Sequence, residues 1–126
     1  MKESLWRLRD WMEDAGRIVF LGGAGVSTES GIPDFRSETG LFTSQNAYGR
    51  LPEEMLHQRT LREQPEDFFA YYRDNMPYLD AKPNNAHRAL AELEKRGKLT
   101  AVNPQNIDRL NQAAGSKRER ARHGSV

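Results

Sequence analysis

The sequence has 126 residues, which is enough for one small domain with a hydrophobic core. Its formal net charge is +1, so no strong overall field draws it toward nucleic acid or a membrane surface. The absence of cysteine excludes disulfides, a thiol nucleophile and thiolate metal ligands. The charged N-terminus lacks the apolar core of a secretory signal, and no apolar run is long enough to cross a bilayer. We therefore expect a cytoplasmic protein.

The first half of the chain predicts a helix, a strand, a turn and a long loop. Residues 4–15 carry apolar side chains at helical spacing, which favours an amphipathic helix packed on a sheet. Residues 17–22 form an apolar run typical of a buried strand, and residues 23–31 predict a glycine turn followed by a short helix. Residues 32–52 show little periodicity, and a loop of this length is usually functional or mobile. We interpret it as a loop that covers a cofactor.

The second half predicts three helices, a strand and a short helix. The helices cover residues 53–62, 65–76 and 84–96, and the last has Asn84 or Asn85 as its cap and Gly97 as its stop. In the second helix an apolar stripe is expected to form core, with the wall of a substrate groove as the alternative; it contains Phe68, Phe69, Tyr72 and Met76. In the third helix the expected apolar face contains Ala86, Ala89, Leu90 and Leu93.

The chain ends in polar sequence. Residues 98–102 predict a second strand, which Asn103-Pro104 should interrupt, and residues 107–114 predict a short helix. Residues 117–122 are polar at nearly every position. They cannot form a buried parallel strand, because such a strand is a near-continuous apolar run.

The glycine turn indicates a nucleotide site. Gly22, Gly23 and Gly25 follow the first strand and precede a helix start, which is the geometry that binds a dinucleotide pyrophosphate. The G-x-G-x-x-G fingerprint is incomplete because Val26, Ser27 and Thr28 follow Gly25, so a turn made only for packing is the alternative. The adjacent Ile32-Pro-Asp-Phe-Arg36 favours the ligand interpretation, since a structural turn has no need for this set of residues.

The other candidate residues also have structural interpretations. Asp34 and Asp108 could be ordinary turn carboxylates, and Gln105-Asn106 could be a plain turn after Pro104. His123 could be a solvated residue near the chain end. His57 and His87 match no metal-ligand spacing and are interpreted as structural or surface residues.

Three separated stretches together resemble the sirtuins, the NAD-dependent protein lysine deacylases, and most closely their bacterial branch. They are the long motif from Gly23 to Arg36, the tetrapeptide Gln105-Asn-Ile-Asp108, and His123-Gly124. Lys82-Pro-Asn-Asn-Ala-His87 also looks like the family's lead into the helix before the second strand. The order and spacing fit from residue 1 to residue 126.

The resemblance implies an α/β fold: a partial Rossmann-like parallel sheet with flanking helices, truncated before the zinc module and the C-terminal strands. Residues 1–126 would be the N-terminal portion of a sirtuin catalytic, NAD-binding domain. The family's zinc would be held by four cysteines beyond this chain, so no metal ligand is expected here. A truncated gene product would explain the missing half.

The resemblance also implies roles for individual residues. Ala24 and Thr28 would lie against the NAD phosphates, with Phe35 and Arg36 in the cofactor loop and Phe35 shielding the nicotinamide side. Gln105 would reach the nicotinamide ribose, and the pocket for the nicotinamide carboxamide would be formed by Asn106, Ile107 and Asp108. His123 would be the general base that takes a proton from a ribose hydroxyl.

This family transfers an acyl group from a lysine to ADP-ribose and releases nicotinamide, so an acyl-lysine protein is the expected substrate. Three positions depart from the family pattern: Pro104 stands where threonine is usual, Arg109 where glycine is usual, and Asn111 where histidine is usual. The first hypothesis is an NAD-dependent deacylase with impaired activity in this form, and the alternative is a non-catalytic NAD- or ADP-ribose-binding fragment. Nucleic-acid binding through Lys117–Arg122 is disfavoured, because aromatic residues do not interleave with its charges.

Overall fold

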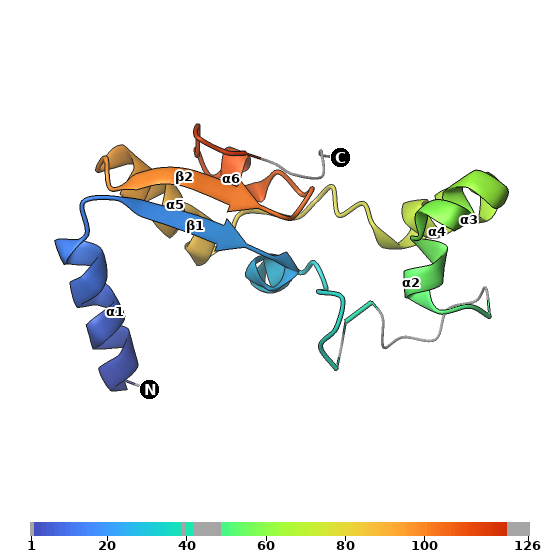
Figure 1. Ribbon diagram of the computed structural model, residues 1–126, viewed down its shortest axis with the longest axis horizontal. Coiled ribbons are helices and arrows are strands. Elements are labelled where there is room, and N and C mark those ends of the chain that lie inside the picture. The colour runs from blue at the N-terminus through green and yellow to red at the C-terminus, as the bar shows by residue number, and fades with distance from the viewer. Residues whose placement is uncertain (1, 39, 42–48, 121–126) are drawn as a thin grey trace. The chain divides into compact units, whose positions relative to one another are not determined.

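The computed structural model describes residues 2–38, 40–41 and 49–120 (Figure 1). They divide into two compact units, and each is described by itself. The sheet unit contains residues 2–23 and 83–120, and the helical unit contains the described residues from 24 to 82. In these ranges no helix combines the length and the apolarity that a membrane span requires.

The sheet unit is built on two parallel strands, β1 (Ile18–Gly22) and β2 (Leu99–Pro104), which lie side by side in Figure 1. The register pairs Phe20 with Val102 and Gly22 with Pro104. Parallel neighbours need a crossover connection, and α5 (Asn85–Lys95) enters β2 through a short turn. Its apolar side packs on one face of the sheet, in a core made of Leu90, Leu99 and Val102 with Ile18, Phe20 and Leu93 around them. The predicted α/β class with a parallel sheet is confirmed.

The bounds of α5 follow its capping residues. The Asn84 carboxamide accepts from the backbone N–H of Ala86 at 2.9 Å, and the His87 ring accepts from the N–H of Asn84 at 3.2 Å, which together form a capping box. Gly97, at φ 73°, stops the helix in a conformation that favours glycine. Both predicted boundaries are confirmed.

The predicted apolar face of α5 is partly wrong. The buried residues of this helix are His87, Leu90 and Ala91, whereas Ala86 and Ala89 are exposed. His87 was not among the predicted apolar residues, but its side chain caps the helix and is also fully buried. The buried arc is therefore rotated toward His87.

The predicted packing of the first helix is also wrong in the described structure. Helix α1 (Lys2–Asp14) forms as expected but buries none of its residues, and Trp6 and Trp11 are 55% and 64% exposed. Its C-terminal end is held by Lys98, whose ammonium donates to the carbonyls of Met12 and Glu13. This contact places a positive charge at the end of the helix that the dipole makes negative.

The end of the sheet differs from the prediction at Pro104 and includes one pairing that the sequence did not indicate. Pro104 does not interrupt β2 but is its last residue, a place where the missing N–H costs little. The polar segment beyond α6 (Leu110–Ala113) reaches β2: Glu119 forms a parallel bridge with Val102, whose N–H donates to Arg118 O and whose carbonyl accepts from Arg120 N. Polar side chains are compatible with this pairing because the segment is mostly exposed.

The helical unit begins with the 3-10 helix η1 (Ala24–Ser30) and continues through a long loop to three helices. The predicted helix over 53–62 is in fact two, α2 (Pro52–Met55) and α3 (Gln58–Glu63), because His57 is extended and caps α3 by accepting from Arg59 N. Both pack against α4 (Pro65–Asn75). Its buried residue is Tyr71, 1% exposed, whereas the predicted core residue Phe69 is 49% exposed.

Candidate functional site

The predicted Gln105-Asn106 pair lies at the carboxyl end of the sheet, against the start of the glycine turn. The Gln105 backbone N–H donates to the Gly22 carbonyl at 2.8 Å, and the Asn106 side-chain Nδ2 donates to the Gly23 carbonyl at 3.1 Å. Two motifs about 80 positions apart in the sequence thus meet where open parallel sheets bind their ligands. Asn106 is half-buried and Gln105 is exposed.

Each of the two glycines, Gly23 and Gly25, leaves open space at its own position. A Cβ built on Gly23 would meet only the Gln105 side-chain oxygen, at 3.8 Å, and a Cβ on Gly25 would meet nothing within 4 Å. Neither glycine has a positive φ. The protein's own packing therefore does not require them, and they are suited to the close approach of a ligand.

Asp108 has a structural contact at its predicted site. Its Oδ1 accepts from the Leu110 N–H at 3.0 Å, where α6 begins. Asp108 therefore has at least the structural role of a turn carboxylate, which is the alternative to a role in the carboxamide pocket. Between Asp108 and Leu110, the Arg109 backbone lies in the left-handed region at φ 59°, which explains why glycine suits this position. Ile107 and Asp108 are both half-buried.

Two ionisable groups, the buried His87 and the half-buried Glu119, interact electrostatically with Asp108. Burial lowers the pKa of His87, and the Asp108 carboxylate acts against this shift. Burial and the Asp108 charge both raise the pKa of Glu119, against the opposing influence of Arg109. His87 Nδ1 accepts a hydrogen bond from Asn84 N, so the neutral ring carries its proton on Nε2, which has no hydrogen-bond partner in the described part of the chain.

The predicted phosphate-binding residues lie on η1, in the helical unit. The Thr28 hydroxyl donates to the Gly25 carbonyl at 2.9 Å, and the Ser27 carbonyl accepts from Ile32 N at 3.3 Å. Ala24 is the first residue of this helix. The helix is a seven-residue 3-10 helix, so a short helix does follow the glycine turn as predicted.

The predicted cofactor residues Phe35 and Arg36 belong to a closed loop. Asp34 accepts at Oδ1 from the Ser37 N–H at 3.2 Å and from the Ser37 hydroxyl at 2.5 Å, and its carbonyl accepts from Leu41 N at 2.8 Å. Phe35 is half-buried, and Arg36 is exposed. Sequence reasoning missed the part that Ser37 and the residues after it play in this loop.

Two of the three histidines have structural roles, and the third lies outside the described residues. His57 and His87 cap helices, so the structural interpretation of both is confirmed. His123, the predicted general base, lies outside the described residues. The described residues also contain no group of three His, Asp or Glu side chains placed to hold a metal ion.

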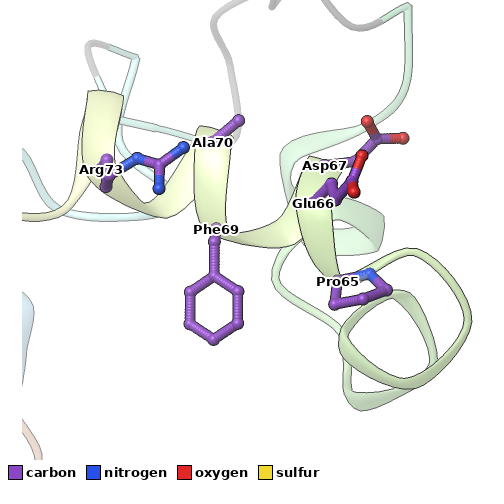
Figure 2. A pocket seen from close by; sticks show the side chains of 6 residues that line it. All are labelled: Pro65, Glu66, Asp67, Phe69, Ala70 and Arg73. Atoms are coloured by element: carbon purple, nitrogen blue, oxygen red, sulfur yellow. The ribbon is translucent and has the colours of Figure 1, made fainter.

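A hollow of about 560 Å³ lies on α4, and none of the predicted site residues lines it. Figure 2 shows its lining, with the Phe69 ring extending from the helix and two carboxylates near the helix start. The lining residues are Pro65, Glu66, Asp67, Phe69, Ala70 and Arg73. None of the predicted site residues is among these lining residues.

Comparison with protein families and curated proteins gives a consistent result. A model of the Sir2 family matches residues 23–126. An NAD-dependent protein deacetylase from Clostridium acetobutylicum is 51% identical over 119 residues, covering 94% of this chain and 49% of the relative. A protein of the same name from Clostridium tetani is 53% identical over 119 residues, with 94% and 48% covered. The chain therefore spans about half the length of the curated relatives it matches.

Solved structures agree with this result. One described as "Structural Basis for the Mechanism and Regulation of Sir2 Enzymes" has a TM-score of 0.87 at 38% identity, covering 99% of this chain and 48% of its own. Another, described as "Sir2-p53 peptide-NAD+", has a TM-score of 0.76 at 42% identity, covering 95% and 45%.

Proposed function

This chain belongs to the Sir2 family, and from that premise we propose that it contributes part of the NAD site of a protein lysine deacetylase. One observation carries the proposal. The parallel pairing of β1 and β2 joins Gln105-Asn106 to Gly22-Gly23 through bonds of 2.8 and 3.1 Å. The names of the relatives and of a solved NAD+ complex support NAD as the cofactor.

The donor set fits a nicotinamide carboxamide. Asn106 offers an amide and Asp108 a carboxylate, which between them complement the donors and acceptor of a carboxamide. The open space at Gly23 and Gly25 suits a ligand in close approach. In this proposal Gln105 binds the ribose next to the nicotinamide, and the half-buried Ile107 completes the carboxamide pocket.

The remaining roles concern the phosphates, the loop and the base. We place Ala24 and Thr28 beside the phosphates and the Phe35 ring over the nicotinamide side, with Arg36 in the same loop. NAD supplies a ribose carbon from which nicotinamide can leave when the acyl oxygen attacks. Phe35 excludes water from that centre, and His123 accepts the proton of a ribose hydroxyl.

The proposed substrate is an acylated lysine in a protein. This follows from the family and from solved relatives described with a p53 peptide and with an acetylated peptide. The zinc of the family finds no fit in this chain, because the sequence has no cysteine and the described residues contain no metal-binding cluster. We assign the zinc no part in the steps above, and the cytoplasmic location stays a prediction.

The alternative is a module that binds NAD or ADP-ribose without catalysis. It rests on the same contacts of Gln105-Asn106 with Gly22-Gly23, which concern binding of the cofactor and not turnover. Both proposals predict cofactor binding, and only the first predicts turnover.

Titration calorimetry with NAD and ADP-ribose, followed by a deacetylation assay on an acetyl-lysine peptide, separates the two. Asp108→Asn keeps the shape of the side chain but removes its charge, and we expect about tenfold weaker NAD binding because charge-assisted hydrogen bonds to the carboxamide are lost. Asp80→Asn, an exposed change in the helical unit, is the matched control. Absence of heat and of any thermal shift with both ligands would contradict both proposals, and binding without turnover would leave the second.

A further inference from the structure

Glu119 places a carboxylate among buried side chains beside β2. It forms a parallel bridge with Val102, and paired residues of neighbouring strands have their side chains on the same face of a sheet. Val102 is completely buried in the core that α5 covers. The neighbours of Glu119 in sequence, Arg118 and Arg120, are exposed, whereas Glu119 is half-buried. The Glu119 side chain is therefore directed toward the core of the sheet unit.

One oxygen of this carboxylate lacks a hydrogen-bond donor. Glu119 Oε2 is buried, and nothing in the described part of the chain donates to it. Burying an ionised carboxylate without a donor costs far more free energy than burying the neutral carboxyl. The pairing of residues 116–120 with β2 thus depends on whether Glu119 carries its charge.

The charges that act on Glu119 lie in the turn after β2. Burial raises the pKa of Glu119 most, the Asp108 charge raises it further, and the Arg109 guanidinium opposes both effects. From α5, the buried His87 interacts with the same Asp108 carboxylate, and Glu94 accepts from backbone N–H groups at the start of the paired segment. Glu119 therefore takes up a proton more readily than an exposed glutamate does.

We propose that Glu119 is a proton-controlled latch for residues 116–120. With a neutral Glu119 carboxyl the segment stays paired with β2, and ionisation leaves a charge in the core and weakens the pairing. Because the pKa of Glu119 is raised in the paired state, pairing is strongest below the ordinary value of 4.5. It weakens as the pH rises from there through the pKa of the paired state.

The latch is coupled to the proposed cofactor site through Asp108. This step rests on the proposed NAD site, in which carboxamide N–H groups donate to Asp108. These donors and the positive charge of the nicotinamide ring reduce the negative field at Glu119, so cofactor binding lowers the pKa of Glu119 and loosens the segment. By linkage, NAD binds more tightly when Glu119 is ionised.

Carbon-13 NMR of the carboxyl groups measures the titration of Glu119 directly, and Glu119→Gln identifies its signal. We expect a midpoint above 4.5 in the parent chain. Arg109→Gln should raise this midpoint because a positive charge is lost, and Asp108→Asn should lower it because a negative charge is lost. A midpoint at or below 4.5, or one that neither variant moves, would overturn the proposal.

Hydrogen exchange measures the pairing itself. The Arg120 amide donates to Val102 O across the pairing, and the Ile18 amide, which donates to Lys98 O, is the reference. After correction for the intrinsic exchange rate at each pH, we expect protection of Arg120 relative to Ile18 to fall about fivefold from pH 4.5 to pH 7.5. The ratio removes acid effects that act on the whole fold.

Two variants decide whether Glu119 causes this dependence. Glu119→Gln has the same shape but does not titrate, so the ratio should no longer change with pH. Glu3→Gln, an exposed change on α1, is the matched control and should behave as the parent chain does. Equal pH dependence in Glu119→Gln and the parent would overturn the latch.

The coupling is tested by repeating the carboxyl titration with bound NAD and with bound ADP-ribose, which lacks nicotinamide. We expect the Glu119 midpoint to lie about 0.3 pH units or more lower with NAD than with ADP-ribose. Equal midpoints with the two bound ligands would overturn the coupling. Failure of the parent chain to bind NAD would contradict the proposed function and the coupling together, while the exchange experiment would still decide whether Glu119 is a latch.

Discussion

Arg109 has a backbone conformation that costs free energy for any residue with a Cβ. Its φ is 59°, in the left-handed region, and it lies between Asp108 and the first residue of α6. Left-handed geometry costs an L-residue roughly 1–2 kcal/mol, and glycine avoids this cost. The exposed side chain of Arg109 is compatible with the site, but its backbone is strained there.

We therefore expect Arg109→Gly to be more stable than Arg109→Ala by about 1 kcal/mol. Both variants lose the guanidinium, so their difference isolates the Cβ. Urea unfolding at neutral pH measures it. Equal stability of the two variants would show that residue 109 relaxes out of the left-handed region.

His87 makes folding sensitive to acid. It is completely buried, and burial lowers its pKa below the ordinary value of 6.5. The unfolded chain then binds more protons at this position than the folded chain as the pH falls through 6.5, so acid favours unfolding. Asp108 opposes this effect but does not reverse it.

We expect thermal stability to fall between pH 7 and pH 5.5, and to fall less in His87→Gln. Glutamine at this position keeps an acceptor for the capping box but does not titrate. Scanning calorimetry across this range measures the slope, and His57→Asn, changed at an exposed cap, shows the effect of losing a histidine elsewhere. The interpretation is wrong if the thermal stability of His87→Gln depends on pH as steeply as that of the parent chain.

At the scale of elements, Glu94 joins α5 to the segment that pairs with β2. Its carboxylate accepts from the Ser116 hydroxyl at 2.5 Å and from the N–H groups of Lys117 and Arg118 at 3.0 Å each. Burial raises the pKa of Glu94, but these hydrogen bonds and the Arg118 charge bring it below its ordinary value. The carboxylate therefore remains ionised in neutral solution and holds the polar segment beside the sheet.

We expect Glu94→Ala to lower the free energy of detaching this segment from the sheet by about 1–2 kcal/mol, because three donors lose their acceptor. Glu94→Gln, which keeps one acceptor, should cost less. Hydrogen exchange of the Arg120 amide, which donates to Val102 O, measures the opening directly. Unchanged exchange at Arg120 in Glu94→Ala would show that the strand pairing holds the segment without Glu94.

Sequence reasoning identified elements whose signals are local. The Asn84 cap, the Gly97 stop and the two strands were predictable because caps, glycine and apolar runs act within a few residues. It failed where tertiary contacts decide: Tyr71 is buried instead of Phe69, and Glu119 pairs with Val102 although its segment is polar. In the site, the motif indicated where Gln105-Asn106 follows the second strand, whereas the hydrogen bond from Asn106 to the Gly23 carbonyl was not predictable, because it joins segments far apart in the sequence.

At the scale of the whole molecule, both tryptophans of the chain lie on α1, 55% and 64% exposed. Arginines lie over both indole rings, with Arg9 4.4 Å from the centroid of Trp6. This arrangement differs from the sequence-based expectation of a helix packed on the sheet. The two arrangements predict different quenching of tryptophan fluorescence, because an indole ring packed on the sheet is shielded from solvent.

We expect acrylamide to quench the tryptophan fluorescence of the folded chain nearly as efficiently as that of the urea-unfolded chain. Trp11→Phe should leave a signal with the same accessibility, since both rings are exposed to a similar degree. Stern–Volmer analysis gives the comparison. A folded chain quenched several times less than the unfolded one would support the packed helix.

The register of the sheet has a consequence for how this sequence tolerates codon-level changes. Gly22 pairs with Pro104, and the next N–H, that of Gln105, makes the bond to the Gly22 carbonyl. Deleting one codon anywhere in β2 would turn its remaining residues to the opposite face and displace the motif that follows. Substitutions on the exposed side of the strand change one side chain, but an in-frame deletion of a single residue removes the alignment on which Gln105 and Asn106 depend.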